Sequence, residues 1–123
     1  AMSSALSRET ILKRILSADI IANYDYILID CLPALGVLLI NALTAAQEMV
    51  IPVQTQKFSL DGLTALTGLH GQIAATINSA LSQPLVLPTI VDNTNVSKNA
   101  LRTLTERFTD TMLKTVIHRQ WLL

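Results

Sequence analysis

Three short apolar runs constrain the fold of this chain more than any other feature of its sequence. They occupy residues 25–30, 48–53 and 85–91, and each has the length of a β-strand. The first run does not alternate between apolar and polar residues, which indicates cover on both faces and therefore a parallel sheet. Parallel strands need crossover connections, usually helices, so the segments between the runs are predicted to be helical.

Segments with helical patterns lie around the three runs. Their apolar residues predict helices over residues 7–23, 35–46, 60–80 and 95–108. Ser59 is suited to cap the third helix, and Asn95 or Ser97 to cap the fourth. A fourth strand is predicted at residues 112–117. Strands that alternate with helices predict one α/β domain over residues 1–123, a three-layer sandwich on a mostly parallel sheet.

Composition excludes several classes of protein. Nine basic and nine acidic residues balance, so the chain as a whole does not attract nucleic acid or anionic lipid. No apolar run approaches the roughly 20 residues of a membrane-spanning helix, and no membrane contact is expected. Cys31 is the only cysteine, which excludes an internal disulfide or a cysteine-cluster metal site and favours a reducing, cytoplasmic setting.

A carboxylate, Asp30, stands at the end of the first apolar run. In parallel α/β sheets, ligands bind beyond the carboxyl ends of the strands. A carboxylate at that place can hold Mg²⁺, directly or through water, beside the phosphates of a nucleotide. The alternative is a strand-ending aspartate that accepts hydrogen bonds from the N–H groups of the following turn.

Many short segments along the chain match one family in order. They are Tyr24-Asp25-Tyr26, Asp30-Cys31, Pro33, Leu35-Gly36, Asn41-Ala42-Leu43, Ile51-Pro52-Val53-Gln54, Phe58-Ser59-Leu60 and Gly62-Leu63. Together they resemble the ParA chromosome- and plasmid-partition ATPases, within the wider group that includes the MinD-like proteins. Residues 87–108 and 116–123 also resemble later parts of that family. The resemblance implies a P-loop NTPase-like fold.

The resemblance also implies roles for individual residues. Asp30 matches the Walker B acid, the catalytic residue that organises Mg²⁺ and its waters. Pro33 lies in the loop that senses the γ-phosphate of ATP in such proteins. Thr89, Asp92 and Asn93 match the loop that borders the adenine, although an ordinary polar turn would use the same residue types.

The family's behaviour implies partners as well. ATP promotes a dimer that holds DNA, and a ParB-like partner protein triggers hydrolysis. Lys98, Arg102 and Arg119 are the candidate DNA contacts, because the family binds DNA through basic side chains of its later half. The alternative is a solvated helix face, since Glu106 continues the spacing of Lys98 and Arg102 and dilutes their charge.

The chain departs from the family pattern in one decisive respect. It has four glycines, at 36, 62, 68 and 71, and no Gly-x-x-x-x-Gly-Lys phosphate loop. We therefore expect the later part of a ParA-like ATPase, without the phosphate-loop part and the C-terminal helix, that binds no ATP usefully by itself. Leu32 also replaces the first of the family's two prolines.

Two other interpretations stay open. The chain could belong to another branch of the superfamily, MinD-like or cobyrinic-acid-synthase-like, or it could be a truncated, non-enzymatic interaction module. In either case the missing phosphate-loop strand would leave two apolar strand edges without partners. We expect residues 25–30 to pair with residues 48–53, or two copies of the chain to associate through these edges.

The remaining reactive side chains are interpreted as packing residues. His70 and His118 have no partner at metal-ligand spacing. Cys31 has no neighbouring positive group and is predicted to be a packed thiol. Trp121 is predicted to anchor a core.

Overall fold

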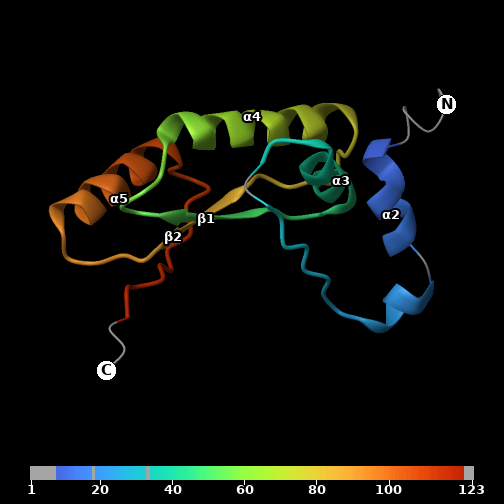
Figure 1. Cartoon of the computed structure of the whole chain (residues 1–123), viewed down its shortest axis with the longest axis horizontal. Helices are drawn as coiled ribbons and strands as arrows, with labels where there is room; N and C mark the ends of the chain where they lie inside the picture. Colours follow the sequence, from blue (N-terminus) through green and yellow to red (C-terminus); the bar gives the residue numbers. More distant parts are fainter. Residues whose placement is uncertain (1–7, 18, 33, 121–123) are drawn as a thin grey trace. The chain divides into compact units, whose positions relative to one another are not determined.

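The computed structural model describes residues 8–17, 19–32 and 34–120, and the predictions for Pro33 and Trp121 lie outside them. Its elements follow one another as helices and strands (Figure 1), in the order η1 (Arg8–Thr10), α2 (Ile11–Leu16), η2 (Asp19–Asn23), α3 (Val37–Ala45), β1 (Val50–Gln54), α4 (Leu60–Thr76), β2 (Leu85–Thr89) and α5 (Asn95–Arg107). They form two compact units. The first unit contains the described residues up to 47 and residues 68–82, and the second contains residues 48–67 and the described residues from 83 onward.

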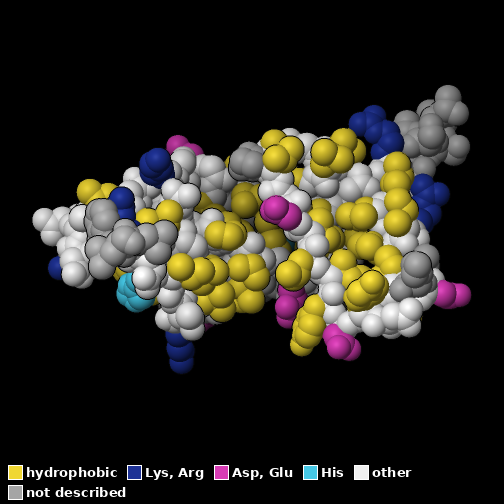
Figure 2. Space-filling model, turned by 60° about the horizontal axis from the view of Figure 1, so that its bottom comes forward, with side chains coloured by type: hydrophobic (Ala, Val, Ile, Leu, Met, Phe, Trp, Pro, Cys, Tyr) yellow, Lys and Arg dark blue, Asp and Glu magenta, His cyan; other side chains and the backbone are white. Residues whose placement is uncertain are grey.

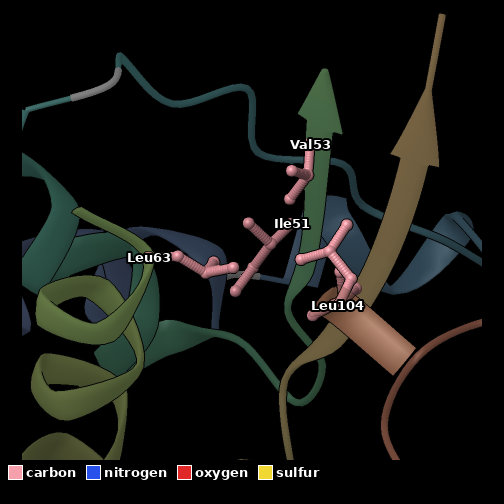
Figure 3. Packing of buried hydrophobic residues seen from close by; sticks show 5 residues of the cluster. Ile51, Val53, Leu63 and Leu104 are labelled. Carbon is pink, nitrogen blue, oxygen red and sulfur yellow. The ribbon is translucent and has the colours of Figure 1, made fainter. Parts of the chain in front are cut away.

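The second unit is built on a two-stranded parallel sheet. β1 pairs with β2, with Val50 opposite Leu85 and Gln54 opposite Thr89, and α4 is the crossover between them. The buried cluster on one face of this sheet consists of Ile51, Val53, Leu63, Val86 and Leu104. Figure 3 shows Ile51 between Leu63 of α4 and Leu104 of α5. The predicted parallel strands and crossover helix are therefore confirmed.

The predicted strand at residues 112–117 is wrong as a regular strand. Residues 111–119 run beside β2 and form two isolated parallel bridges, Val86 with Met112 and Val91 with His118. The main chain of Val86 exchanges hydrogen bonds with this segment, whereas Pro88 accepts one from Ile117 N–H and has no N–H to return. The missing donor interrupts the ladder between the two bridges.

Polar side chains hold the first unit together. The Asn41 Oδ1 atom accepts a hydrogen bond from the N–H of Leu12 at 3.2 Å. Asn78, which is buried, donates from Nδ2 to the carbonyls of Leu43 at 2.9 Å and Ala46 at 2.7 Å, at the end of α3. His70 is 4% exposed and its Nε2 lies 2.7 Å from the carbonyl of Ser82, so its predicted packing role is confirmed.

The predicted helix over residues 7–23 is interrupted. α2 ends at Leu16, and a separate 3-10 turn follows at residues 19–23. The Ser17 hydroxyl donates to the carbonyl of Arg14 at 2.7 Å, while the Ser17 N–H bonds the carbonyls of Lys13 and Arg14. Serine side chains compete in this way with the helical ladder, which explains where the helix stops.

The predicted strand at residues 25–30 is absent, and this is the largest correction. Residues 26–30 have no regular secondary structure, and the sheet contains β1 and β2 alone. Tyr26 is 88% exposed and Leu28 is 94% exposed. A strand forms through hydrogen bonds to a neighbouring strand, and the predicted pairing with residues 48–53 does not occur, so the apolar pattern alone does not make this segment a strand.

Cys31 shares the exposure of that segment, so the prediction of a packed thiol is wrong. Partial desolvation raises the pKa of Cys31, and the neighbouring Asp30 carboxylate raises it further. The thiol therefore stays protonated near neutral pH. Across the described part of the chain, no helix has the length and apolar character needed to cross a bilayer.

Candidate functional site

The carboxyl ends of β1 and β2 are joined by a polar network in the second unit. The N–H of Thr55, just after β1, donates to the carbonyl of Thr89 at 3.2 Å. The Oγ1 of Thr55 lies 2.8 Å from the Oγ of Ser97, in the first turn of α5. Thr94 caps α5, because its hydroxyl accepts from the N–H of Ser97 at 3.2 Å. The cap is therefore neither Asn95 nor Ser97, whereas the predicted cap at Ser59 is confirmed by its bond to the N–H of Gly62.

Asp92 organises the loop that follows β2. One carboxylate oxygen accepts from the N–H and the hydroxyl of Thr94, at 3.0 and 2.6 Å. The other accepts from Gln56 Nε2 at 2.6 Å and lies 3.8 Å from the guanidinium of Arg119. The bonds from Thr94 lower the pKa of Asp92 most, followed by the bond from Gln56 and the charge of Arg119.

Ile90 has a left-handed backbone conformation within this loop, with φ of 54°. β-Branched residues rarely occupy that region, and it costs such a residue about 1–3 kcal/mol. The conformation persists because the surrounding hydrogen bonds hold it, including one from Thr55 Oγ1 to the carbonyl of Ile90 at 3.3 Å. Strain of this kind is common at ligand sites.

A hollow of about 560 Å³ opens beside the loop, lined by Val91, Asp92, Asn93, Thr94, His118 and Arg119. It brings together Asp92 and Asn93, which were predicted to bind a cofactor, and Arg119, which was predicted to contact DNA. Thr89 ends β2 immediately before the strained turn. The sequence pattern thus predicted the place of the loop, but not that Arg119 belongs to it.

Asp30 belongs to the first unit, where its side chain is exposed. No described residue donates a hydrogen bond to its carboxylate. Among the described residues, Asp30 therefore does not accept hydrogen bonds from the N–H groups of the following turn, which was the alternative interpretation. A single hard oxygen donor of this kind suits Mg²⁺, which keeps several waters and takes one or two protein carboxylates beside substrate phosphates.

The two remaining candidate DNA contacts lie on the outer face of α5. Lys98 and Arg102 are both exposed and one helical turn apart. The guanidinium of Arg102 is also 3.4 Å from the side-chain oxygen of Asn99. Both side chains are thus accessible to a polyanion. The same exposure is expected of a solvated helix face that binds nothing.

Sequence reasoning missed the side chains that build the loop: Thr55, Gln56, Thr94 and His118, with Ser97 considered only as a cap. Thr94 and Ser97 stand three apart before an amphipathic run, which is the spacing of a helix cap and could have been noticed. Nothing local marks Thr55 and Gln56, because their partners lie 35 or more residues away in the sequence.

The lowered pKa of Asp92 predicts a specific pH dependence of stability. The carboxylate stabilises the fold above the unfolded pKa of about 4, and this contribution is lost as the pH falls through the lower folded value. In urea unfolding, the difference in stability between the parent and Asp92→Asn should be largest near pH 6 and shrink in acid. Thr94→Val, which removes one of the main bonds, should reproduce part of the loss; a difference independent of pH would contradict the assignment.

The chain has extensive similarity to known proteins. A family model described as AAA domain matches residues 1–83. The chain is 44% identical over 115 residues to the sporulation initiation inhibitor protein Soj of Bacillus subtilis. The aligned residues make up 93% of this chain and 45% of that protein. It is 40% identical over 113 residues to the chromosome-partitioning ATPase Soj of Treponema pallidum, with 91% and 44% covered.

Solved structures are similar too. Cobyrinic acid a,c-diamide synthase from Mycobacterium smegmatis, with bound ADP and magnesium, superimposes with a TM-score of 0.81 at 32% identity, over 93% of this chain and 46% of that one. The predicted P-loop NTPase-like α/β fold class is confirmed. The chain spans less than half the length of these relatives. By its family match and its relatives, the chain belongs to the AAA-domain family, among the ParA/MinD-like partition ATPases.

Proposed function

We propose that this chain is part of a ParA-like ATPase that uses Mg²⁺ and ATP to position chromosomal or plasmid DNA in the cytoplasm. The observation that carries the proposal is the hollow beyond the carboxyl end of β2, since folds of this class bind their ligands beyond the carboxyl ends of their strands. Membership of the partition ATPases supports the same conclusion.

Each candidate residue has a defined role in this proposal. Thr89, Asp92 and Asn93 form the loop that borders the nucleotide base, and Asp92 does so mainly by shaping the loop, since both carboxylate oxygens already have partners. In the first unit, Asp30 is proposed to hold Mg²⁺, directly or through water. Bound Mg²⁺ would offset the charge of the phosphates.

The phosphates themselves need groups that this sequence does not contain. Backbone N–H groups of a glycine-rich loop and its lysine normally bind them, and no such motif occurs in the 123 residues. The chain alone is therefore expected to bind ATP poorly. The test is a joined protein, in which this chain follows the part of the B. subtilis relative that precedes the matched region. We expect the joined protein to hydrolyse ATP; a folded joined protein without nucleotide binding would refute the proposal.

DNA and a ParB-like protein are the proposed partners. Lys98 and Arg102 are the first candidates for DNA contact, because Arg119 lies 3.8 Å from Asp92 and DNA would compete with that carboxylate. Two or three cations give weak binding that falls steeply with salt concentration. Such binding fits a surface that becomes effective once two copies are held together by ATP.

We also propose that copies of the chain associate through the exposed segment at residues 24–38. Its exposed apolar side chains are Tyr24, Tyr26, Ile27, Leu28, Leu32, Leu35, Val37 and Leu38. Exposed hydrophobic side chains are coloured yellow in Figure 2. Surfaces of this kind usually mark an interaction site.

Self-association predicts a clear effect of charge in this segment. Leu28→Lys should shift the chain toward the monomer in sedimentation velocity, because Leu28 is 94% exposed in the free chain and a charge there cannot be buried against a second copy. Val96→Lys, at a residue 57% exposed on α5, is the matched control and should leave the distribution unchanged. A parent chain that is monomeric at high concentration would contradict the proposal.

The similarity to cobyrinic acid a,c-diamide synthase favours a second candidate function, an ATP-dependent enzyme that acts on a cobyrinic-acid-type substrate. The joined protein distinguishes the two. A partition ATPase should hydrolyse ATP faster in the presence of DNA and a ParB-like protein, whereas the second candidate should respond to the small-molecule substrate.

A further inference from the structure

Two buried hydroxyl groups lie beneath the loop at residues 90–94. Thr55 is 2% exposed and Ser97 is not exposed at all, and their oxygen atoms are 2.8 Å apart. Neither residue belongs to the predicted ligand contacts. A valine would fill the space of Thr55 equally well, so the hydrogen bonds distinguish this pair from an ordinary apolar contact.

The two hydroxyls also bond two main-chain groups of the strained turn. Thr55 Oγ1 donates to the carbonyl of Ile90 at 3.3 Å, and Ser97 Oγ accepts from the N–H of Asp92 at 3.2 Å. Because Thr55 uses its single proton on that carbonyl, Ser97 must donate to Thr55 in the bond between them. The three bonds form one directed chain from Asp92 N–H to Ile90 C=O.

That chain of bonds holds the main chain directly after the left-handed residue. The two bonded groups are the carbonyl of Ile90 itself, whose φ is 54°, and the N–H of Asp92. If Ile90 relaxed to an extended conformation, its carbonyl and the N–H of Asp92 would turn away from Thr55 and Ser97. Two buried polar groups would then lose their partners, which opposes the relaxation.

We propose that the Thr55–Ser97 hydroxyl pair is a positioning device, which fixes the turn at Ile90 and presents Asp92, Asn93 and Thr94 to the hollow in one arrangement. The pair acts through the loop and touches no ligand. The identity of that ligand as a nucleotide base rests on the proposed function, whereas the positioning itself rests on the bonds just described.

The test compares isosteric variants by NMR. Thr55→Val removes the hydroxyl and keeps the shape, Thr55→Ser restores the hydroxyl, and Thr44→Val is the matched control. Thr44 is 1% exposed and bonds the carbonyl of Ile40 within α3, in the other unit. The hydrogen-exchange rate of the Asp92 amide measures how firmly the loop is held. The exchange rate of the Val86 amide, which donates to the carbonyl of Thr111, measures the stability of the sheet.

The expected result is loss of protection confined to the loop. In Thr55→Val, the Asp92 amide should exchange at least about tenfold faster and the Cα and Cβ shifts of Ile90 should move toward extended values, while Val86 stays within about twofold. Thr55→Ser should behave like the parent, and so should Thr44→Val. Unchanged exchange and unchanged Ile90 shifts in Thr55→Val would overturn the proposal, as would equal losses at Asp92 and Val86.

A titration with AMP separates this inference from the proposed function. Millimolar AMP should shift the amide signals of Asn93 and Thr94 in the parent. In Thr55→Val, the same shifts should need an AMP concentration about tenfold higher. If AMP shifts nothing in the parent, the base contact fails while the exchange data still decide the positioning. If AMP binds the parent and Thr55→Val equally, the base contact stands and the positioning role toward the ligand is refuted.

Discussion

Asp30→Asn is expected to lower kcat for ATP hydrolysis by about 10²–10³-fold in the joined protein. An amide keeps the size of the side chain but loses the charge that holds Mg²⁺ beside the phosphates. The side chain is exposed and no described residue bonds it, so the change should leave folding intact. Phosphate release measured at saturating Mg²⁺ and ATP provides the rate, and the circular dichroism spectrum verifies the fold.

The matched control is Asp25→Asn, five residues earlier in the same exposed segment. Asp25 precedes the apolar run, whereas Asp30 follows it and resembles the Walker B acid of the family. We expect the Asp25 variant to retain activity within about threefold. Equal losses in the two variants would show a general effect of charge in this segment, and the Mg²⁺ role of Asp30 would then be rejected.

Leu104→Ala is expected to destabilise the chain by about 2–5 kcal/mol. Leu104 is not exposed at all, and it packs with Ile51, Val53, Leu63 and Val86 in the core of the second unit. The substitution removes buried apolar surface and leaves a cavity between α5 and the sheet. Since small domains have about 5–15 kcal/mol of stability in total, this loss should lower the urea midpoint markedly.

Leu101→Ala provides the comparison, because it is the same substitution one turn earlier on α5. Leu101 is half-buried, so it loses less apolar contact and should cost clearly less than Leu104→Ala. Both variants are measured by urea unfolding followed by circular dichroism. Similar costs for the two would mean that the core does not lie where Ile51, Leu63 and Leu104 meet.

The sequence pattern predicted the second unit well because its elements find their partners within the chain. The apolar residues of β1 and β2 face the same helices, so local pattern and tertiary packing agree. Residues 25–30 have the pattern of a buried strand and yet form none, since strand pairing depends on a neighbour that local sequence does not supply. The interruption after α2 depends on Ser17, whose side chain competes with the helix.

The position of the loop after β2 could be predicted from the sequence, whereas the hydrogen bonds that shape this loop could not. The end of β2 could be located from the apolar run that precedes Asp92, and resemblance supplied the rest. The bonds that shape the loop connect Thr55 with Ser97 and Gln56 with Asp92, across 42 and 36 residues of sequence. Pairings over such distances follow from the fold, and no local spacing encodes them.

Calorimetric titration of Mg·ATP into this chain and into the joined protein tests the central claim most directly. The claim is that nucleotide binding needs a phosphate loop that does not occur among these 123 residues. We predict no binding by the chain at micromolar nucleotide and clear binding by the joined protein. Micromolar binding of Mg·ATP by the chain alone would contradict the account.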